Sequence, residues 1–315
     1  MRHSSKRSRL LATVTALGLI LAACGDGESG QTTTTGTSAV TSSTVPTSTT
    51  GAPMTTTTAA AATTSAAPEP SGHVVYFMLD ELDVEDGSPG PFLVPVYREG
   101  SASGIEAAIE LLLEGPTEDE TSGIPMISTA IPAGTSLLGV TTEAGVATVD
   151  LSGGFDDGGG SFAMFARLAQ LTYTMTRLPD VDAVELSLDG KPVTVFSSEG
   201  IELDGPQERA DYYDLLPPIF VDSPAWGEPV TSPVEVRGLS NVFEATSQVL
   251  LTDDDGLSLF EDHVTATCGT GCWGEWEVDV PYTVDREQFG ALIVWELSAR
   301  DGSEINIREY PVILR

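Results

Sequence analysis

Two cysteines near the C-terminus have a spacing that suits a disulfide. Cys268 and Cys272 are separated by Gly269-Thr270-Gly271, a stretch that turns sharply enough to bring the two Cα atoms within the roughly 4.4–6.8 Å that a disulfide requires. A zinc site is disfavoured because His73 and His263 are the only histidines beyond the first 23 residues. A redox pair usually has two intervening residues and basic surroundings, which this stretch lacks. We therefore expect a structural disulfide and no metal.

Two other stretches have the composition of binding loops but not their spacing. Asp253-Asp254-Asp255 is acidic enough for calcium, yet an EF-hand loop ends in a glutamate at its twelfth position, and Glu261 comes too early. Residues 153–161, "GGFDDGGGS", lack the Lys-Ser/Thr ending of a phosphate loop, and Asp156 and Asp157 would repel phosphate. We expect an acidic turn at the first stretch and a flexible loop at the second.

The sequence also lacks a recognisable catalytic motif. No serine lies in a nucleophile-elbow sequence, and His263 has no surrounding triad pattern. Carboxylates are abundant, with 44 Asp and Glu in residues 73–315, so pairs at glycosidase-like spacing arise by chance. We therefore expect a protein that is not an enzyme and has no cofactor.

The third cysteine follows a short apolar segment. Four basic residues lie within the first nine positions, and Leu10–Ala23 is mostly apolar but shorter than the about 20 residues of a membrane-spanning helix. Residues 1–23 are therefore typical of a signal peptide. Leu21-Ala22-Ala23-Cys24 resembles the lipobox that bacterial signal peptidases cut before the cysteine. The resemblance implies a lipid on Cys24 that anchors the protein on the extracytoplasmic face of the cell membrane, since each buried CH₂ contributes about 0.8 kcal/mol.

Residues 24–72 predict a disordered tether between this anchor and the folded part. Between Gln31 and Ser71 the chain is mostly Thr, Ser, Ala, Gly and Pro, without aromatic residues. Such a composition buries too little apolar surface to offset the entropy of ordering. A stalk rich in Thr, Ser and Pro is also a weak indication of O-glycosylation.

The remaining residues, 73–315, are strongly acidic. They carry ten Lys and Arg against 44 Asp and Glu, and the whole chain has a formal net charge of −33. A field of that sign repels nucleic acid and anionic lipid head groups. We therefore expect no nucleic-acid partner, and a membrane contact only through the lipid on Cys24.

Residues 73–205 predict an α+β domain in which a hairpin is followed twice by a helix and a hairpin. Val74–Leu79 and Phe92–Arg98 are β-prone runs that indicate the first hairpin. The spacing of Ser103 to Glu106 is that of a capping box at the start of a helix, and Gly115-Pro116 ends that helix.

The same order then recurs further along the chain. Leu137–Val140 and Val146–Leu151 flank a short turn and indicate a second hairpin. An apolar helical pattern runs from Met164 to Leu178, and alternating residues from Val184 to Leu188 end at an Asp-Gly turn. We expect both helices to cover one face of a single sheet.

This region contains several separated motifs, which are "VYF" (75–77), "LVPVYR" (93–98), "AAIELLLEGPTEDE" (107–120), "TAIPAGTSLLGV" (129–140), "GVATVDLS" (145–152) and "RLAQLTYTMTRLP" (167–179). Together they resemble the GerMN domain, which is named from bacterial spore-germination proteins and found in actinobacterial lipoproteins. Related domains in sporulation proteins look like ring-building modules. The resemblance therefore implies self-association or docking to a membrane complex, whereas the sequence itself shows no connection to spores.

Residues 206–216 are expected as a linker, and residues 217–315 predict an immunoglobulin-like β-sandwich. Short β-prone runs are separated by turn-forming residues; the runs are Val234–Arg237, Phe243–Leu251, Leu257–Phe260, Glu275–Pro281, Ala291–Leu297 and Ile305–Leu314. Alternation predicts that Trp276, Val278 and Val280 face inward. We expect a second inward row at Ile293, Trp295 and Leu297, with Leu292 and Val294 on the opposite, partly apolar face.

This second region also resembles a known family. "PIFVDSPAWGEPVTSPVEVRGLSNVFEA" (218–245), with "GEWEVDVPY" and "RDGSE" further on, resembles the immunoglobulin-like domain of bacterial spore germination. That domain often follows GerMN, so the two resemblances support each other.

Together these observations favour a non-catalytic, lipid-anchored envelope protein. Its two extracytoplasmic domains would mediate docking or assembly with other envelope proteins, such as a membrane sensor or transport assembly, with self-association left open. A first alternative is a lipoprotein that binds cell-wall carbohydrate, for which Trp226 and Trp273 are candidates because both lie in turn-like contexts. The remaining alternative is an envelope hydrolase, which would need a cleft with clustered carboxylates.

Overall fold

The computed structural model describes residues 72–80, 90–100 and 103–315. Cys24, the expected signal peptide at 1–23 and residues 24–71 of the expected tether lie outside the described residues. No helix in the described part of the chain combines the length and the apolar character needed to span a membrane.

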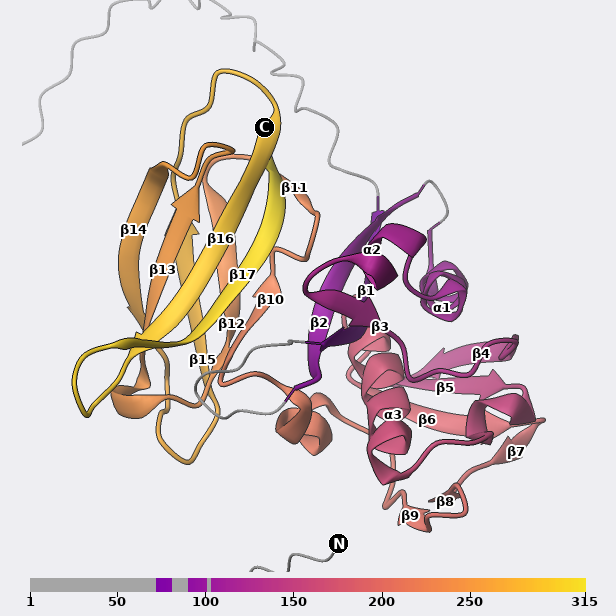
Figure 1. Ribbon diagram of the computed structural model, residues 1–315. Coiled ribbons are helices and arrows are strands. Elements are labelled where there is room, and N and C mark those ends of the chain that lie inside the picture. The colour runs from indigo at the N-terminus through magenta and orange to yellow at the C-terminus, as the bar shows by residue number, and fades with distance from the viewer. Residues whose placement is uncertain (1–71, 81–89, 101–102) are drawn as a thin grey trace, which may run out of the picture. The chain divides into compact units, whose positions relative to one another are not determined.

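The first folded domain is a mixed α+β structure, as predicted (Figure 1). Its elements are β1 (Gly72–Asp80), β2 (Phe92–Glu99), α1 (Ile105–Glu114), α2 (Glu118–Ser122), β3 (Met126–Ser128), β4 (Leu137–Glu143), β5 (Val146–Leu151), the 3₁₀ turn η1 (Gly153–Asp156), α3 (Ser161–Met175), β6 (Ala183–Leu188), β7 (Lys191–Pro192), β8 (Val195–Phe196) and β9 (Ile201–Glu202).

The three expected hairpins are present, the third of them as the short antiparallel pairing of β6 with β7 at the Asp-Gly turn. β1 and β2 pair antiparallel from Gly72 opposite Glu99 to Leu79 opposite Phe92, and β4 pairs antiparallel with β5. The short strand β3 joins the other side of β1, which gives the strand order β2-β1-β3. β1 lies in the middle of this sheet, which explains why Val75 to Leu79 are all buried.

The expectation of one sheet covered on one face by both helices is wrong. The domain has two main sheets, and in the second one β6 pairs with β5 in parallel, with α3 as the crossover between them. α3 contacts both β1 and β6, so it lies between the sheets. Its sequence explains this position, because nearly every residue from Met164 to Met175 is buried, and a helix buried on all sides cannot lie on a single outer face.

The start of α1 also differs from the expectation. Its N-cap is Gly104, and no side chain caps the helix there, so Ser103 does not form the expected capping box. A capping box forms instead one helix later, where the side chains of Thr117 and Glu120 bond each other's backbone N–H groups. The predicted end of α1 is confirmed, since Gly115 adopts a φ of 80° that favours glycine.

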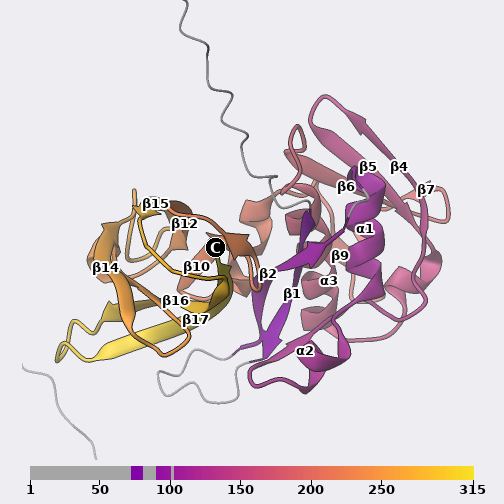
Figure 2. The same cartoon turned by 90° about the horizontal axis from the view of Figure 1, so that it is seen from above.

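The second folded domain is an immunoglobulin-like sandwich, as predicted (Figure 2). Its elements are β10 (Ile219–Ser223), β11 (Pro229–Val230), β12 (Val234–Ser240), the 3₁₀ turn η3 (Phe243–Ala245), β13 (Thr246–Thr252), β14 (Ser258–Thr265), β15 (Gly274–Val280), β16 (Gln288–Leu297) and β17 (Glu304–Leu314). One sheet has the order β10-β12-β15 and the other β11-β17-β16-β13-β14.

The faces of β16 are the reverse of the expected ones. Leu292 and Val294 are buried, whereas Leu297 is 49% exposed. Both faces of this strand are apolar, so the two-residue alternation of side chains along it does not determine which face points inward. The buried face continues to Glu296, whose carboxylate accepts hydrogen bonds from the Phe243 backbone N–H and from Asn306.

The expected linker contains an ordered turn that packs on the first domain. Arg209–Leu215 form the 3₁₀ turn η2, which packs against α3 and buries Tyr212 and Leu215. The tyrosine also donates a hydrogen bond to Gln207 at 2.8 Å.

A continuous set of buried aromatic rings runs from the first domain into the sandwich. The ring of Tyr76 in β1 meets Tyr173 of α3 edge-on at 5.3 Å, and Tyr173 meets Phe220 of β10 in the same way at 6.0 Å. All three side chains are fully buried, so the cores of the two domains are in direct contact.

Candidate functional site

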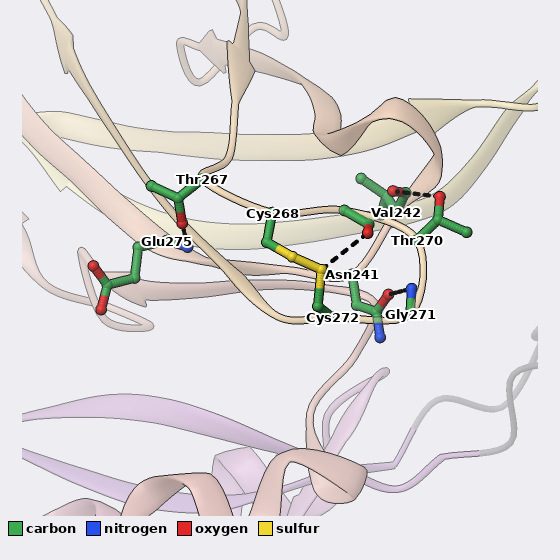
Figure 3. Close-up of a disulfide and its surroundings, with 9 residues drawn as sticks. Asn241, Val242, Thr267, Cys268, Thr270, Gly271, Cys272 and Glu275 are labelled. Atoms are coloured by element: carbon green, nitrogen blue, oxygen red, sulfur yellow. Dashed lines mark hydrogen bonds between the residues drawn. A yellow bond between two sulfur atoms is a disulfide. The ribbon is translucent and has the colours of Figure 1, made fainter.

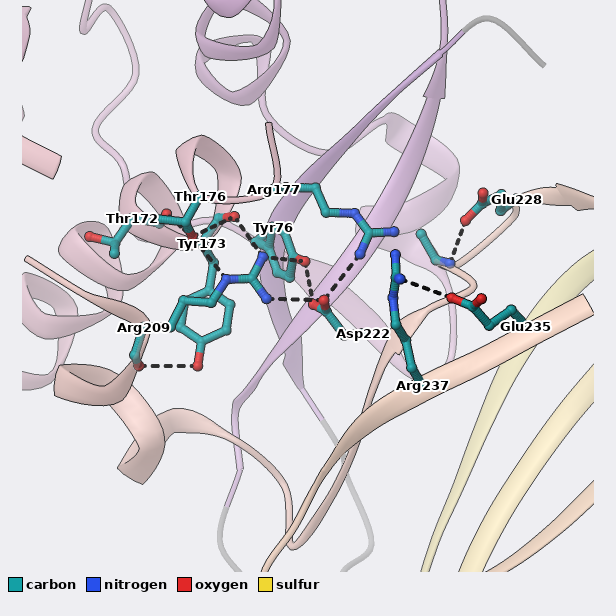
Figure 4. A network of polar contacts seen from close by, with 11 residues as sticks. Tyr76, Thr172, Tyr173, Thr176, Arg177, Arg209, Asp222, Glu228, Glu235 and Arg237 are labelled. Atoms are coloured by element: carbon teal, nitrogen blue, oxygen red, sulfur yellow. Dashed lines mark hydrogen bonds and ion pairs between the residues drawn. The ribbon is translucent and has the colours of Figure 1, made fainter. Parts of the chain in front are cut away.

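A charged cluster lies beside these rings, where β10 of the sandwich meets the first domain (Figure 4). The carboxylate of Asp222 is its centre. Its Oδ2 atom accepts hydrogen bonds from Arg177 and Arg209, each at 3.0 Å. The three side chains are between 16% and 24% exposed. Asp222 follows three buried apolar residues of β10, and this strand carries the carboxylate against the first domain.

Tyr76 contributes the fourth group of the cluster. Its hydroxyl donates to Oδ1 of Asp222 and accepts a hydrogen bond from Nη2 of Arg209 at 3.2 Å. Its backbone is held in β1 by Thr174 and Gln170 of α3. Both carboxylate oxygens of Asp222 are therefore paired with groups of the first domain.

The guanidinium of Arg209 is surrounded on several sides. It lies over the rings of Tyr76 and Tyr173, at 5.5 and 4.8 Å from their centroids, and its Nε donates to Thr176 Oγ1 at 2.8 Å. Cation–π contacts of this kind contribute about 0.5–2 kcal/mol, more when they are shielded from water. This arginine thus connects α3, β1 and β10.

The electrostatics of the cluster favour its charged form. Burial alone would raise the pKa of Asp222, but Arg209 and Arg177 hold the pKa below its ordinary value. Burial alone would likewise lower the pKa of Arg209, which the neighbouring Tyr76 and Asp222 instead raise. Burial, opposed by the two arginines, raises the pKa of the Tyr76 hydroxyl. At neutral pH the tyrosine is thus a neutral donor to an ionised carboxylate.

A short backbone bridge forms a second connection between the two domains. Trp226 lies opposite Val96 of β2. The backbone N–H of Trp226 donates to the carbonyl of Pro95 at 2.9 Å, and the N–H of Tyr97 donates to the carbonyl of Trp226 at 3.0 Å. The indole of Trp226 is half-buried and packs against the core. We call the contact region formed by the cluster around Asp222 and by this backbone bridge the joint. Trp226 is part of the joint.

The cysteine pair has the placement that a disulfide needs (Figure 3). Cys268 and Cys272 are joined through their sulfur atoms, with Cα atoms 5.9 Å apart. The loop between them is fixed to the turn after β12, since the N–H of Thr270 donates to Val242 at 2.9 Å and that of Gly271 to the Asn241 side chain at 2.8 Å.

Trp273 follows this loop and is also half-buried. Its ring packs against that of Tyr213 in η2, with centroids 5.5 Å apart. The structure does not bring Trp226 and Trp273 together as one platform, since one bridges to β2 and the other stacks on η2. Neither presents a fully exposed ring of the kind that binds sugars.

The two stretches considered as binding loops both have local structural roles. In residues 153–161 the expected flexible loop contains η1, with Phe155 fully buried, and Arg167 of α3 donates to the carbonyls of Phe155, Asp157 and Gly158. Asp253 forms a turn by accepting hydrogen bonds from the next backbone N–H groups. Within the described residues, no three His, Cys, Asp or Glu side chains gather as a metal site.

The comparisons with known proteins agree with this two-domain architecture. Residues 74–194 match the family Germane, described as sporulation and spore germination. Residues 218–303 match Gmad2, the immunoglobulin-like domain of bacterial spore germination. The chain carries a GerMN domain followed by a Gmad2 domain. Domains of these two families are generally non-catalytic, and no enzyme family matches.

Solved structures add distant likenesses to the GerMN domain. The first GerMN domain of the sporulation protein GerM from Bacillus subtilis is 16% identical with a TM-score of 0.36, and the match covers 44% of this chain and 98% of that one. The tandem GerMN domains of the same protein are 14% identical with a TM-score of 0.37, covering 68% and 62% of the respective chains. No curated protein matches the chain.

Sequence reasoning missed the joint between the GerMN and Gmad2 domains. Arg177, Arg209 and Asp222 are single polar residues that lie far apart along the chain and form no local motif. One signal was nevertheless present. Arginine is scarce in this acidic chain, and an aspartate inside the apolar run Ile219–Ser223 requires a buried partner.

Proposed function

We propose that this protein is a non-catalytic, lipid-anchored envelope protein whose GerMN and Gmad2 domains together dock other envelope proteins at the outer face of the membrane. A membrane sensor or transport assembly is the class of partner proposed. The observation that carries the proposal is the joint around Asp222. Because charge pairs, ring contacts and a backbone bridge connect the domains, surfaces on both can meet one partner in a defined arrangement.

The proposed anchor rests on the N-terminal sequence. Leu21-Ala22-Ala23-Cys24 has the pattern of a lipidated cysteine after a signal peptide. The following residues up to Gly72 are long enough to reach roughly 160 Å from the membrane when extended. Mass spectrometry of the mature protein is expected to find an acylated Cys24 as the first residue, and an unmodified N-terminus elsewhere would contradict the anchor.

The chemistry of the joint supports a structural role over a catalytic one. Asp222 accepts three hydrogen bonds from Tyr76, Arg177 and Arg209, at both of its oxygens. Because two of these donors are arginines that stabilise its ionised form, the carboxylate is a weak general base. The pKa of this carboxyl is held low by Arg209 and Arg177, against the effect of burial, whereas a catalytic acid needs a raised one.

In-cell crosslinking of the anchored full chain tests the docking role. We expect a reproducible set of envelope proteins to be crosslinked to the wild-type protein, and fewer with Asp222→Asn, which weakens the joint. Asp262→Asn is the matched control, because this residue is 57% exposed and pairs only with His263. Crosslinks between two copies of the chain would show self-association. If both variants and the wild type capture no envelope protein above background, the docking proposal is wrong.

A sedimentation experiment separates docking from wall binding. The full chain with Cys24→Ser, which removes the lipid, is mixed with insoluble cell wall and centrifuged. We expect it to stay in the supernatant. Saturable pelleting that survives moderate salt and is lost in Trp226→Ala or Trp273→Ala would contradict the proposal and favour carbohydrate binding.

A further inference from the structure

Arginines are unevenly distributed in this chain. Residues 73–315 contain nine arginines and one lysine among 44 acidic residues. Three of these arginines, Arg177, Arg209 and Arg237, nevertheless line one cavity of about 340 Å³, together with Thr176 and a single acidic residue, Asp222. The lining therefore has a formal charge of +2 inside a protein whose overall charge is −33. Such a local excess of positive charge in an acidic protein attracts an anion at that position.

The hydrogen bonds of the three arginines divide them into two kinds. Arg209 uses each of its nitrogens, for Thr176, Asp222, and the oxygens of Tyr76 and Tyr173. Four of its five N–H donors are therefore engaged within the joint.

Arg177 and Arg237 are different. Arg177 donates one hydrogen bond, from Nη1 to Asp222, and Arg237 donates one, from Nη1 to Glu235. A guanidinium has five N–H donors, so most donors of both side chains are left for a ligand. Their side chains are 17% and 49% exposed, respectively. Figure 4 shows Arg177, which follows the C-terminal end of α3, and Arg237, from β12, turned toward each other beside Asp222.

A carboxylate is the anion that fits this pair best. Two guanidinium groups provide parallel N–H donors, which match the two oxygens of a planar carboxylate. A phosphate with two charges would be repelled more strongly by the acidic surroundings, which include Glu235 beside Arg237. A carboxylate adds only one charge, which the local excess offsets.

The neighbouring cavity provides room for the chain that bears this carboxylate. A second cavity of about 630 Å³ shares Arg209, Asp222 and Arg237 with the first one and continues along the outer face of β12 and β15. Its lining includes Tyr213 and Leu239, against which a short peptide can pack, and Thr265 and Thr267, which carry hydroxyl groups. Glu275 and Glu277 also line it, so the peptide that adjoins the carboxylate is expected to be neutral or basic. The size and mixed lining suit a peptide segment.

We propose that Arg177 and Arg237 bind a carboxylate of a protein partner, whose adjoining peptide lies in the larger cavity. The inference rests on the proposed docking function for the identity of the partner as a protein. The carboxylate is either an acidic side chain or a C-terminal carboxylate, because both present the same two oxygens to the guanidinium pair.

Peptide titrations followed by NMR test the site directly. The full chain with Cys24→Ser is titrated with acetyl-Gly-Glu-Gly-amide for a side-chain carboxylate and with acetyl-Gly-Gly-Gly-OH for a C-terminal one. Acetyl-Gly-Gln-Gly-amide is the neutral control and inorganic phosphate the competing anion. We expect saturable shifts of the Nε–Hε signals of Arg177 and Arg237 with one or both carboxylate peptides, at affinities at least about tenfold above the neutral control. Exposed Arg300 is the internal reference.

Three outcomes of the titration would overturn the proposal. Shifts at Arg177 and Arg237 that do not exceed those at Arg300 would show no site. Equal affinity for the neutral peptide would show that the carboxylate is not recognised. Tighter binding of phosphate would show a different ligand class. The relative affinities of the two carboxylate peptides distinguish the two sources.

Variants of Arg237 provide the matched comparison. Arg237→Gln is expected to weaken carboxylate binding by about tenfold or more, and Arg237→Lys by a smaller factor, because lysine keeps the charge but not the paired donors. Arg300→Gln removes the same charge from an exposed turn and is expected to leave the affinity unchanged. The thermal unfolding midpoint should be the same in all three variants, since Arg237 pairs only with exposed Glu235.

In-cell crosslinking of Arg237→Gln separates this inference from the proposed function. If the same envelope proteins are captured by the variant and by the wild type, docking stands and the carboxylate site is wrong. If capture is lost with Arg237→Gln and kept with Arg300→Gln, both stand. If the peptides bind but no envelope protein is captured by the wild type, the site stands as a carboxylate-binding site and the docking function is wrong.

Discussion

Two arginines that precede the Gmad2 domain use opposite kinds of partner. Arg167 is 3% exposed and donates to four backbone carbonyls, those of Ala130, Phe155, Asp157 and Gly158. Arg209 instead pairs with the carboxylate of Asp222, which belongs to the Gmad2 domain. An arginine that organises a loop within one domain can be satisfied by neutral carbonyls. An arginine that pairs across a joint makes each domain depend on the charge of the other.

The comparison predicts the largest loss for the internal arginine. Arg167→Met keeps much of the side-chain length but leaves four carbonyls without their donor. We expect a loss of about 3–5 kcal/mol in the free energy of unfolding, measured by urea denaturation. Arg300→Met in an exposed turn should change stability by no more than about 0.5 kcal/mol. Similar losses for the two variants would show that the carbonyl contacts of Arg167 contribute little.

Removing the charge at the joint should have a smaller effect. Asp222→Asn leaves Arg177 and Arg209 without their counter-charge, and because these side chains are 16–24% exposed we expect a loss of about 2–3 kcal/mol. We also expect the single unfolding transition to broaden or split, because the two domains become less coupled. A loss no larger than that of Asp262→Asn would show that charge does not hold the joint.

The pH dependence should locate this contribution at the carboxylate. Since Arg209 and Arg177, acting against burial, lower the pKa of Asp222, the folded state binds its proton more weakly than the unfolded state, whose pKa is near 3.9. The stability from Asp222 is therefore fully present above that value and is lost as the pH falls through the lower, folded pKa. The difference in the free energy of unfolding between the wild type and Asp222→Asn should stay constant from pH 7 to about 5 and shrink below about pH 4. A constant difference down to pH 2 would contradict this.

The smallest effect is expected from the tyrosine of the cluster. Tyr76→Phe keeps the ring that packs on Tyr173 and removes the hydroxyl bonded to Asp222. We expect a loss of about 1 kcal/mol in the same denaturation experiment, because Asp222 keeps both arginine partners. Tyr97→Phe is the control on the neighbouring strand. A loss above that of Asp222→Asn would show that the hydroxyl, and not the ion pairs, dominates the joint.

The local elements of the fold were predictable because each is encoded in a continuous stretch. The β1–β2 hairpin and the end of α1 at Gly115 follow from alternation and turn chemistry. The parallel pairing of β5 with β6 does not follow from such local patterns. The two strands are separated by α3, and which strand each of them pairs with depends on the packing of the whole core. The inward face of β16 was missed for a related reason, because both of its faces are apolar.

The candidate site was less predictable than the fold. The cysteine pair has a local signature in its spacing, whereas the cluster around Asp222 joins residues 133 and 146 positions apart. No periodic sequence pattern predicts such a contact, because each residue of the cluster is a single position in a different part of the chain. The tryptophans show the converse problem. Trp226 and Trp273 lie in turn-like sequences, which suit sugar binding or packing, and the partners of both come from distant segments, β2 and η2.

The bridge between Trp226 and β2 also bears on solubility. β2 is the outer strand of its sheet, and an outer strand with unpaired amide and carbonyl groups is a template for aggregation. Here the backbone N–H of Trp226 donates to the carbonyl of Pro95, and the carbonyl of Trp226 accepts from the N–H of Tyr97. Pro95 itself has no N–H that could bond to another strand. The Gmad2 domain thus covers part of an edge that the GerMN domain would expose by itself, and we expect this cover to disfavour edge-to-edge association.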